Sequence, residues 1–479
     1  MFLGFKNLKS QQKLLYKTIL YDIIAKKVNM KIILIVPHIG RKSSDKYVRT
    51  WMIEPLPIAT IAGLTPRDIE LKFIDERIGE QIDFDEDADL VGINVEAYTA
   101  KRAYEISAEF EKRGVKSIIG GYHAMLMPHE VKKYAYSVMK GSAEDVWEEV
   151  IEDCKRGELK REYAPKPLQE IKFRMPRRDI FEGKNYLKLK CVETGRGCPF
   201  DCEFCSVASA TNSKFIAKPI DLIIEDIKDT GSKVIFFVDD NIVGDIKHTK
   251  ELLRQLIPLK IKWISQGSLN MAEDEELLQL MKESGCAGIL IGFESMNKES
   301  LKKMGKHFMV KMKTEEHIQK IHSYGMGIYG TFIFGYETDS IADFEASVEF
   351  AIDNGIFIGA FNHLMPFPGT KLYYNMKRDG ILLGDPWWLN PNYRFNDIPY
   401  HTEHIESKEV REVCLRARRR FYSFSAIFKR ARNRQGNLNT IRKVLGYFSI
   451  NFMLKKEIDE KDGLPLGNEN RWLEALYED

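Results

Sequence analysis

Short runs of apolar residues alternate with amphipathic stretches along most of this chain, and they form two series. The first series starts at Met30, and its β-branched, nearly continuous apolar runs predict buried strands. The expected strands are Lys31–Pro37, Ile69–Asp75, Leu90–Val95, Ser117–Gly121 and Tyr136–Gly141, with helices at Ala59–Leu64, Ala100–Arg113 and Ala143–Cys154. Buried strands separated by helices are typical of a parallel sheet covered on both faces. We therefore expect an α/β, Rossmann-like domain over residues 30–155.

Ligands of such a sheet lie beyond the carboxyl ends of its strands. The loops at those ends combine glycine with polar residues, and they are Pro37–Gly40, Glu96–Ala100, Gly120–His123 and Gly141–Glu144. The first strand is not followed by GxGxxG, the fingerprint that binds dinucleotide pyrophosphate. A nicotinamide cofactor is therefore disfavoured.

The second series follows a charged, proline-bearing stretch, residues 156–190, that is typical of a linker. Its expected strands are Cys191–Thr194, Lys233–Val238, Lys260–Ser265, Ala287–Ile291, Gly327–Phe334 and Ile356–Leu364. Helices are expected between them, at Ile220–Asp229, His248–Leu256, Glu275–Ser284, Val310–Tyr324 and Ser340–Asn354. This recurrence predicts a partial (β/α)6 TIM barrel over residues 191–395, with function at the carboxyl ends of its strands.

The two ends of the chain lack strand patterns. Residues 1–29 place apolar side chains on one helical face and lysines on the other, which suits an ordinary helix or one lying in a membrane interface. Residues 396–479 are expected to form a helical C-terminal extension, and arginine is concentrated between Arg416 and Arg434. This basic run suits either a phosphate-bearing or membrane-bound substrate or a solvated helix face.

Composition narrows the class of protein. The 479 residues contain 72 Lys and Arg against 70 Asp and Glu, and the net charge of +2 argues against a nucleic-acid-binding protein. No run reaches the roughly 18 apolar residues of a membrane span, so a cytoplasmic protein is expected, with peripheral membrane contact as an open alternative. Seven cysteines are too few for a disulfide-stapled secreted fold, yet three of them fall between positions 198 and 205.

These three cysteines carry the strongest chemical signal. Cys198, Cys202 and Cys205 lie in the loop after the first expected barrel strand. Such short spacing lets one loop wrap three thiolates around a metal centre. Three ligands leave one coordination position open, which is typical of a reactive centre, whereas a structural zinc site would need a fourth ligand such as Cys191.

The CxxxCxxC motif, with Phe204 before its last cysteine, resembles that of the radical S-adenosylmethionine (SAM) enzymes. The resemblance implies that Cys198, Cys202 and Cys205 hold a 4Fe–4S cluster whose fourth iron binds the amino and carboxylate groups of SAM. Phe204 would then pack near the adenine. Reductive cleavage of SAM in that family yields a 5′-deoxyadenosyl radical, which abstracts hydrogen from substrate.

Later segments agree with the resemblance in their order along the chain. Asp239 and Asp240 end the second barrel strand, where the family places groups that accept the methionine ammonium. Carboxylates suit an ammonium group physically. Glu294 ends the fourth strand, where a carboxylate would accept hydrogen bonds from the ribose hydroxyls.

The preceding domain resembles the cobalamin-binding domain of cobalamin-dependent radical SAM enzymes. This resemblance rests on Glu54–Pro57, on Gly120 and Gly121 in GGYH, and on Gly141 in GSAED. One departure is that His38 lacks the Asp and Gly of the DxHxxG motif, whose His binds cobalt from below. Two interpretations remain: cobalamin bound without a histidine ligand, or a domain that kept the fold and lost the cofactor.

The resemblance implies methylation of an unactivated carbon in a lipid-like or tetrapyrrole-like molecule. It also implies a hydrophobic small-molecule substrate and an electron donor such as flavodoxin or ferredoxin. Two alternatives stay open, an oxidative cyclase or carbon–carbon bond-forming enzyme on the same scaffold and a non-catalytic iron–sulfur redox sensor. A transfer RNA methylthiolase resembles this barrel but carries three more cluster cysteines upstream, where this chain has only Cys154 and Cys191.

Overall fold

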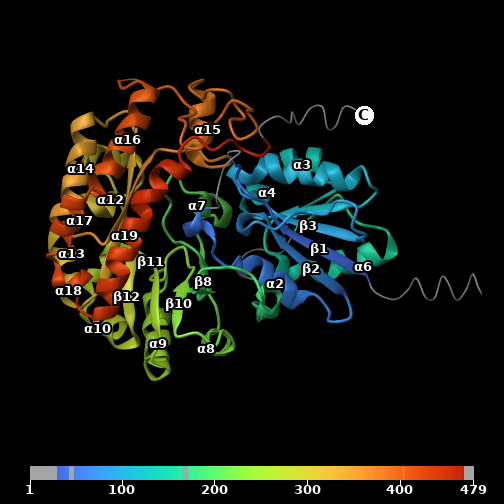
Figure 1. Cartoon of the computed structure of the whole chain (residues 1–479), viewed down its shortest axis with the longest axis horizontal. Coiled ribbons are helices and arrows are strands. Elements are labelled where there is room, and N and C mark those ends of the chain that lie inside the picture. The colour runs from blue at the N-terminus through green and yellow to red at the C-terminus, as the bar shows by residue number, and fades with distance from the viewer. Residues whose placement is uncertain (1–29, 42–47, 165–170, 403, 469–479) are drawn as a thin grey trace, which may run out of the picture.

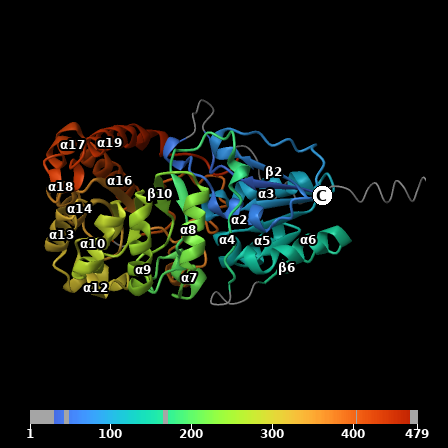
Figure 2. The same cartoon turned by 90° about the horizontal axis from the view of Figure 1, so that it is seen from below.

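The computed structural model describes residues 30–41, 48–164, 171–402 and 404–468. The amphipathic stretch 1–29 lies outside these ranges, so the interpretations of it stay predictions. Figure 1 shows an N-terminal α/β part on the right, a second sheet on the left and the C-terminal helices packed around that second sheet. The two parts lie side by side in both views (Figures 1 and 2).

The N-terminal part is a parallel six-stranded sheet in the order β2-β1-β3-β4-β5-β6. Its strands are β1 (Lys31–Val36), β2 (Glu70–Asp75), β3 (Leu90–Asn94), β4 (Ser117–Gly120), β5 (Ser137–Met139) and β6 (Glu162–Tyr163). Its helices are α2 (Leu56–Leu64), α3 (Ala100–Glu111), α4 (Tyr122–Leu126), α5 (Pro128–Tyr134) and α6 (Trp147–Arg156). The expected α/β fold is confirmed, since residues from both faces of β1 are buried in two separate apolar cores.

Strand β6 falls within the stretch that the sequence pattern assigns to a linker. It pairs with β5, and the Tyr163 hydroxyl donates to Asp153 at 2.8 Å on α6. Glu162 forms an ion pair with Lys140 at 2.5 Å and a second one with Lys132. A strand of two residues is too short to show the alternation of apolar and polar positions that predicts a strand. The contacts that hold it come from elements distant in the sequence, so the sequence pattern did not predict it.

The second part is also a parallel six-stranded sheet, in the order β14-β13-β12-β11-β10-β7. Its strands are β7 (Lys190–Val192), β10 (Val234–Phe237), β11 (Lys262–Gly267), β12 (Cys286–Glu294), β13 (Gly327–Phe334) and β14 (Ile358–His363). A two-stranded antiparallel ribbon, β8 (Gly195–Gly197) and β9 (Phe215–Ala217), flanks α7 (Ser206–Thr211). The remaining helices are α8 (Ile220–Asp229), α9 (Ile246–Leu256), α10 (Glu275–Ser284), α11 (Lys298–Lys303), α12 (His307–Lys311), α13 (Thr314–Ser323), α14 (Ile341–Asp353) and α15 (Lys371–Arg378).

The C-terminal extension consists of α16 (Ser407–Phe421), α17 (Phe424–Arg430), α18 (Arg434–Asn437) and α19 (Ile441–Lys461). Its side chains cover the free edge of β14. Arg418 donates to the Phe361 carbonyl at 2.9 Å, the Tyr422 hydroxyl donates to that of Gly359 at 3.0 Å, and Arg430 donates to that of Ile356 at 2.9 Å. These bonds satisfy edge carbonyls that would otherwise invite pairing with another strand. Part of the arginine-rich run is thus structural, and Arg430 is fully buried.

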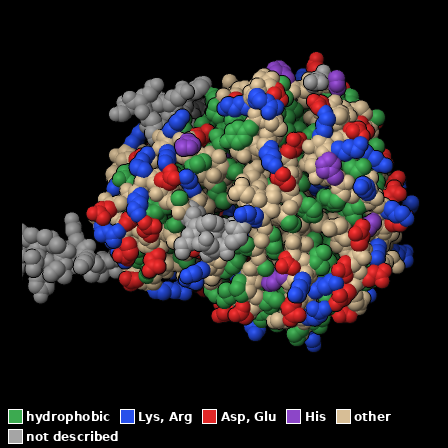
Figure 3. Space-filling model, turned by 180° about the vertical axis from the view of Figure 1, so that it is seen from behind, with side chains coloured by type: hydrophobic (Ala, Val, Ile, Leu, Met, Phe, Trp, Pro, Cys, Tyr) green, Lys and Arg blue, Asp and Glu red, His purple; other side chains and the backbone are tan. Residues whose placement is uncertain are grey.

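The surface carries charges of both signs. Figure 3 shows Lys and Arg interspersed with Asp and Glu over the rear face of the molecule. Within the described ranges, no helix is both long and apolar enough to cross a bilayer.

Candidate functional site

A cavity of about 890 Å³ lies where the carboxyl ends of the N-terminal strands face the second sheet. The strand order β2-β1-β3 places the reversal of strand order between β1 and β3, which is where open α/β sheets bind ligands. Residues of the barrel complete the wall opposite, namely Cys191, Glu193, Arg196, Val238 and Asp240. The size is at the upper end of the roughly 300–1,000 Å³ typical of small-molecule sites. The cavity therefore suits a large ligand held between the two parts.

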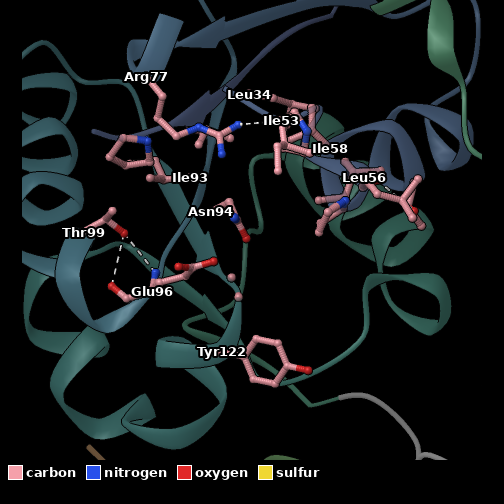
Figure 4. A pocket seen from close by; sticks show the side chains of 18 of the residues that line it. Leu34, Ile53, Leu56, Ile58, Arg77, Ile93, Asn94, Glu96, Thr99 and Tyr122 are labelled. Atoms are coloured by element: carbon pink, nitrogen blue, oxygen red, sulfur yellow. Dashed lines mark hydrogen bonds between the residues drawn. The ribbon is translucent and has the colours of Figure 1, made fainter. Parts of the chain in front are cut away.

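The cavity wall is mainly apolar with a few polar groups directed inward. Figure 4 shows Leu34, Ile58 and Ile93 on the wall, and Asn94, Glu96 and Tyr122 around the hollow. Glu96 follows β3, and its side chain is exposed to the hollow although it lies deep in the protein. Burial raises the pKa of the Glu96 carboxyl, and the Arg77 charge opposes that shift.

The glycines predicted to bind cofactor lie at the strand ends that open onto this cavity. Gly120, Gly121 and Gly141 all line it. Gly121 and Gly141 have φ angles of 113° and 119°, which favour glycine. A Cβ at Gly121 would lie 2.5 Å from the Val95 carbonyl oxygen, so this glycine lets two loops of the rim approach each other.

His38 lines the same cavity, and its backbone is anchored while its ring makes no hydrogen bond with the described residues. Its backbone N–H donates to Glu76 at 3.3 Å, and its Nε2 lies 3.8 Å from the same carboxylate. Arg102 also binds Glu76, at 2.7 Å. The His38 Nδ1 is buried and has no hydrogen-bond partner among the described residues. Burial lowers the pKa of His38 to about 4, so the ring is neutral at neutral pH.

This depressed pKa predicts a pH-dependent stability. The unfolded chain binds a proton at His38 near pH 6.5 and the folded chain only near pH 4, so stability is lost as the pH falls through this window. Between about pH 7 and pH 5 the wild-type protein should lose about 2 kcal/mol more of its free energy of unfolding than the His38→Gln variant. Urea unfolding at both pH values measures the difference, and equal losses in the two proteins would contradict this interpretation.

The three clustered cysteines lie on one loop that is anchored at several points. Phe200 stacks on Phe308 with ring centroids 4.8 Å apart. Asp201 forms an ion pair with Lys371 at 2.5 Å, and the Glu203 carbonyl accepts from the Leu372 N–H at 3.0 Å. The loop is thus fixed by α12 and α15 on either side.

The thiols themselves are partly exposed and electrostatically coupled. Burial is the main cause that raises the pKa of Cys202 to about 12; the Lys306 charge opposes the shift, and negative charge on Cys205 or Cys198 adds to it. The Asn241 Nδ2 lies 3.8 Å from the Cys198 sulfur. Nowhere in the described ranges do three His, Cys, Asp or Glu side chains lie close enough together to hold a single metal ion. The three thiols are nevertheless near enough for the charge of one to shift the pKa of another. Phe204 is partly buried against the barrel core.

Asp239 and Asp240 have different surroundings although they are neighbours. Asp239 is buried and accepts from the backbone N–H groups of Thr194 at 2.8 Å and Gly195 at 2.6 Å. Burial raises its pKa to about 7. Asp240 lines the cavity, accepts from the Gly197 N–H at 3.0 Å, and has its pKa raised to about 6 by burial. Asp239 thus fixes the strand that leads into the cysteine loop, whereas Asp240 is available to a ligand.

Glu294 is linked to the cysteine loop by Lys306, a residue that the sequence pattern did not single out. The Lys306 Nζ donates to the Glu294 carboxylate at 2.5 Å and to the Gly292 carbonyl at 2.9 Å. Burial lowers the pKa of Lys306, but Glu294 and Cys202 raise it more, so the net shift is upward. Glu294 has a φ of 64°, an uncommon conformation for a residue other than glycine. Lys306 thus places a fixed positive charge between Glu294 and the thiols.

Arg196 joins the two walls of the cavity and was also missed by sequence reasoning. Its guanidinium donates to Glu144 at 2.8 Å and to Ser142 at 2.8 Å, both in the loop after β5. It also binds Glu193 at 2.8 Å, next to β7. Burial lowers the pKa of Arg196, but Glu193 and Glu144 raise it more, so the group remains charged.

Removing this guanidinium should destabilise the protein. Arg196→Ala leaves the Glu144 carboxylate, whose side chain is 3% exposed, without its cation. We expect a loss of about 3 kcal/mol in the free energy of unfolding, measured by urea denaturation. Arg254→Ala, which removes an exposed ion pair with Glu276, is the matched control and should cost about 0.5 kcal/mol or less. Equal losses in the two variants would contradict a role for Arg196 in joining the walls.

Comparisons with known proteins agree with this geometry. Residues 192–351 match the radical SAM superfamily. The bacteriochlorophyllide d C-12(1)-methyltransferase of Chlorobaculum tepidum is 31% identical over 80% of this chain and 86% of its own length. The hopanoid C-2 methylase of Rhodopseudomonas palustris is 24% identical, over 78% of this chain and 72% of its own.

A solved structure shares the fold at low sequence identity. The cobalamin-dependent S-adenosylmethionine radical enzyme OxsB, in a structure with aqua-cobalamin and S-adenosylmethionine bound, aligns with a TM-score of 0.60 at 15% identity. The alignment covers 90% of this chain and 72% of OxsB. It therefore includes both the N-terminal sheet and the barrel.

Proposed function

This chain belongs to the radical SAM superfamily, among its cobalamin-dependent, methyltransferase-like members, and from that premise we propose that it methylates an unactivated carbon of a lipid-like or tetrapyrrole-like substrate. The observation that carries the proposal is the cavity between the two sheets. It joins the loops expected to bind cobalamin to the barrel strands that lead into the cysteine loop. A methyl donor and a radical source must reach the same substrate carbon, and a shared cavity permits this.

The donor set suits a 4Fe–4S cluster with one open iron. Cys198, Cys202 and Cys205 supply three thiolates from one anchored loop, and cysteine sulfur is the usual ligand of such clusters. The Lys306 ammonium, whose pKa is raised by Cys202 and Cys205, would offset part of the negative charge of the thiolates. The Asn241 side-chain amide would donate a hydrogen bond to the sulfur of Cys198.

SAM would bind beside these cysteines through groups at neighbouring strand ends. Asp240 is the better candidate for the methionine ammonium because it lines the cavity, whereas Asp239 is buried and its Oδ1 accepts from two backbone N–H groups. Glu294 would accept from the ribose hydroxyls, and Lys306 would hold its carboxylate in place. Phe204 remains a candidate for the adenine.

The N-terminal side of the cavity offers side chains whose chemistry suits cobalamin. Apolar side chains would contact the macrocycle, while Asn94, Glu96 and Tyr122 offer polar groups to its periphery. His38 lacks the Asp and Gly of the DxHxxG motif, and this supports cobalamin bound without a histidine ligand. His38→Gln should therefore retain cobalamin.

When bound, the cluster and SAM supply a carbon radical that removes hydrogen, and cobalamin supplies the methyl group. The protein's part is to position the substrate and exclude water, because stray side chains or solvent quench a radical. The apolar wall excludes water, and the salt bridge from Arg196 to Glu144 keeps the two walls together. The hydrophobic wall also suits substrates like those of the relatives, a bacteriochlorophyllide and a hopanoid.

The proposal is tested with purified protein reconstituted anaerobically with iron, sulfide and cobalamin. We expect bound cobalamin and SAM-dependent formation of 5′-deoxyadenosine with a reduced flavodoxin or ferredoxin as electron donor. A cyclised or dehydrogenated product without an added methyl group would select the oxidative cyclase. A cluster whose spectrum does not change when SAM is added would support the non-catalytic redox sensor instead.

A further inference from the structure

An exposed apolar surface lies outside the cavity, on α17 and the first half of α19. The four most exposed large apolar side chains in the described part of the chain are all there: Ile441 (79%), Leu445 (69%), Phe424 (59%) and Phe428 (57%). Figures 1 and 2 show α17 on the barrel side of the molecule, away from the N-terminal sheet. Scattered apolar residues are normal on a protein surface, whereas a concentrated group indicates an interaction site.

These side chains form one continuous surface. Ile441, Leu445, Phe448 and Phe452 follow each other at spacings of four, three and four, so they share one face of α19. Phe424 and Phe428 are one turn apart on α17, and their rings contact Phe452 at 5.9 Å and Phe448 at 5.6 Å. We call this set of six side chains the α17–α19 face.

The helices that carry the face are firmly held from beneath. The Tyr447 hydroxyl donates to the Ile427 carbonyl at 2.7 Å, which ties α19 to α17. Arg430 binds Asn451 at 3.0 Å and the Phe421 carbonyl at 3.0 Å, and its guanidinium lies 3.7 Å from the Phe421 ring centroid. Tyr447, Arg430 and Asn451 occupy the buried sides of the two helices. Five of the six apolar side chains are therefore exposed, and Phe448 is partly buried.

Exposed arginines lie on α19 and in the segment that joins α17 to α19. Arg432, Arg434 and Arg442 are exposed and form no ion pair with the described part of the chain. The Lys455 ammonium lies 5.2 Å from the Phe424 ring centroid. A hollow at one end of the face is lined by Phe424, Phe452, Ile458, Arg419, Lys455, Lys456 and Asp459. Arg419 is paired there with Asp459 at 2.8 Å and Lys456 with Glu460 at 3.6 Å, so Lys455 supplies the positive charge that no ion pair with a described residue offsets.

We propose that the α17–α19 face docks on the surface of an anionic lipid bilayer. Aromatic and aliphatic side chains beside Lys and Arg are the composition of surfaces that lie in a membrane interface. The apolar side chains would enter the boundary of headgroups and acyl chains, while the arginines bind lipid phosphates. An acidic membrane complements this charge, which argues against a partner that is neutral or basic.

Sedimentation of the full-length protein with lipid vesicles tests this proposal. We expect binding to vesicles of phosphatidylcholine mixed equally with phosphatidylglycerol, weaker binding to phosphatidylcholine alone, and release by salt. The double variant Phe428→Glu and Leu445→Glu should bind the mixed vesicles about tenfold or more weakly, because two buried apolar contacts are replaced by repelled charges. Both positions are exposed, so folding should be kept.

Two further variants test whether vesicle binding depends on the α17–α19 face and on the charge beside it. Tyr374→Glu adds a charge at a side chain that is 53% exposed on α15, and it should bind like the wild type. Arg432→Glu with Arg442→Glu should weaken binding to the mixed vesicles and leave the weak binding to phosphatidylcholine unchanged. The proposal is overturned if the double variant binds like wild type, if only deletion of residues 1–29 abolishes binding, or if the face instead mediates a concentration-dependent dimer that ignores vesicles.

Discussion

Replacing Cys202 by alanine is expected to lower the rate of 5′-deoxyadenosine formation by more than about 100-fold. Two thiolates cannot hold a cluster that needs three protein ligands, so SAM would lose the iron that binds it. The loop itself should keep its place, because Phe200, Asp201 and Glu203 anchor it through other groups. The measurements are the iron content, the visible absorbance of the cluster, and 5′-deoxyadenosine after anaerobic reconstitution.

Cys154→Ala is the matched control for this variant. It makes the same chemical change at a partly exposed cysteine whose sulfur lies 3.5 Å from the Asp89 carbonyl oxygen, at the N-terminal sheet. It should keep the cluster and the activity. A Cys202→Ala protein with wild-type cluster content and 5′-deoxyadenosine formation would show that the cysteine loop is not the cluster site.

The second large effect is expected at Glu96, whose side chain projects into the cavity (Figure 4). Glu96→Trp puts an indole where the cavity is open, so it should block a large ligand, while the backbone of residue 96 keeps its hydrogen bonds to Thr99. We expect cobalamin affinity to fall by about 100-fold, equivalent to about 2.8 kcal/mol. Equilibrium dialysis with cobalamin measures the affinity, and thermal unfolding without cobalamin reports on the fold.

Glu96→Gln controls for the loss of charge at this position. It keeps the length of the side chain, so cobalamin should bind with about the wild-type affinity. If Glu96→Trp also bound cobalamin like the wild type, the cofactor would have to lie elsewhere. The proposal for the N-terminal domain would then be wrong.

The strands of both sheets were largely predictable because each carries its signal locally. Lys31–Val36 is a continuous apolar run, and its burial on both faces follows from the helices on either side. Strand β6 could not be predicted in this way, since Glu162 and Tyr163 are held by Lys140, Lys132 and Asp153 from distant elements. The same holds for Arg430, whose buried position depends on the edge of β14.

In the candidate site too, residues with a local sequence signal could be predicted, and residues defined by contacts with distant elements could not. The cysteine loop was predictable, because three residues of one rare type at short spacing form a local signal. The Glu96 loop was predictable from the rule that ligands bind at strand ends. Lys306 and Arg196 could not be predicted, because the role of each depends on an ion pair with a residue distant in the sequence. Lys306 pairs with Glu294, and Arg196 pairs with Glu144 across the domain interface.

The central claim is that this enzyme adds a methyl group derived from SAM to a hydrophobic molecule. Cells with and without the protein, grown on methionine carrying a ¹³C methyl group, test it directly through mass spectrometry of their lipid and pigment extracts. The account predicts a compound present only with the protein, heavier than its precursor by one CH₂, with the label in the added carbon. A product that depends on the protein but is cyclised or dehydrogenated and carries no added label would contradict the account.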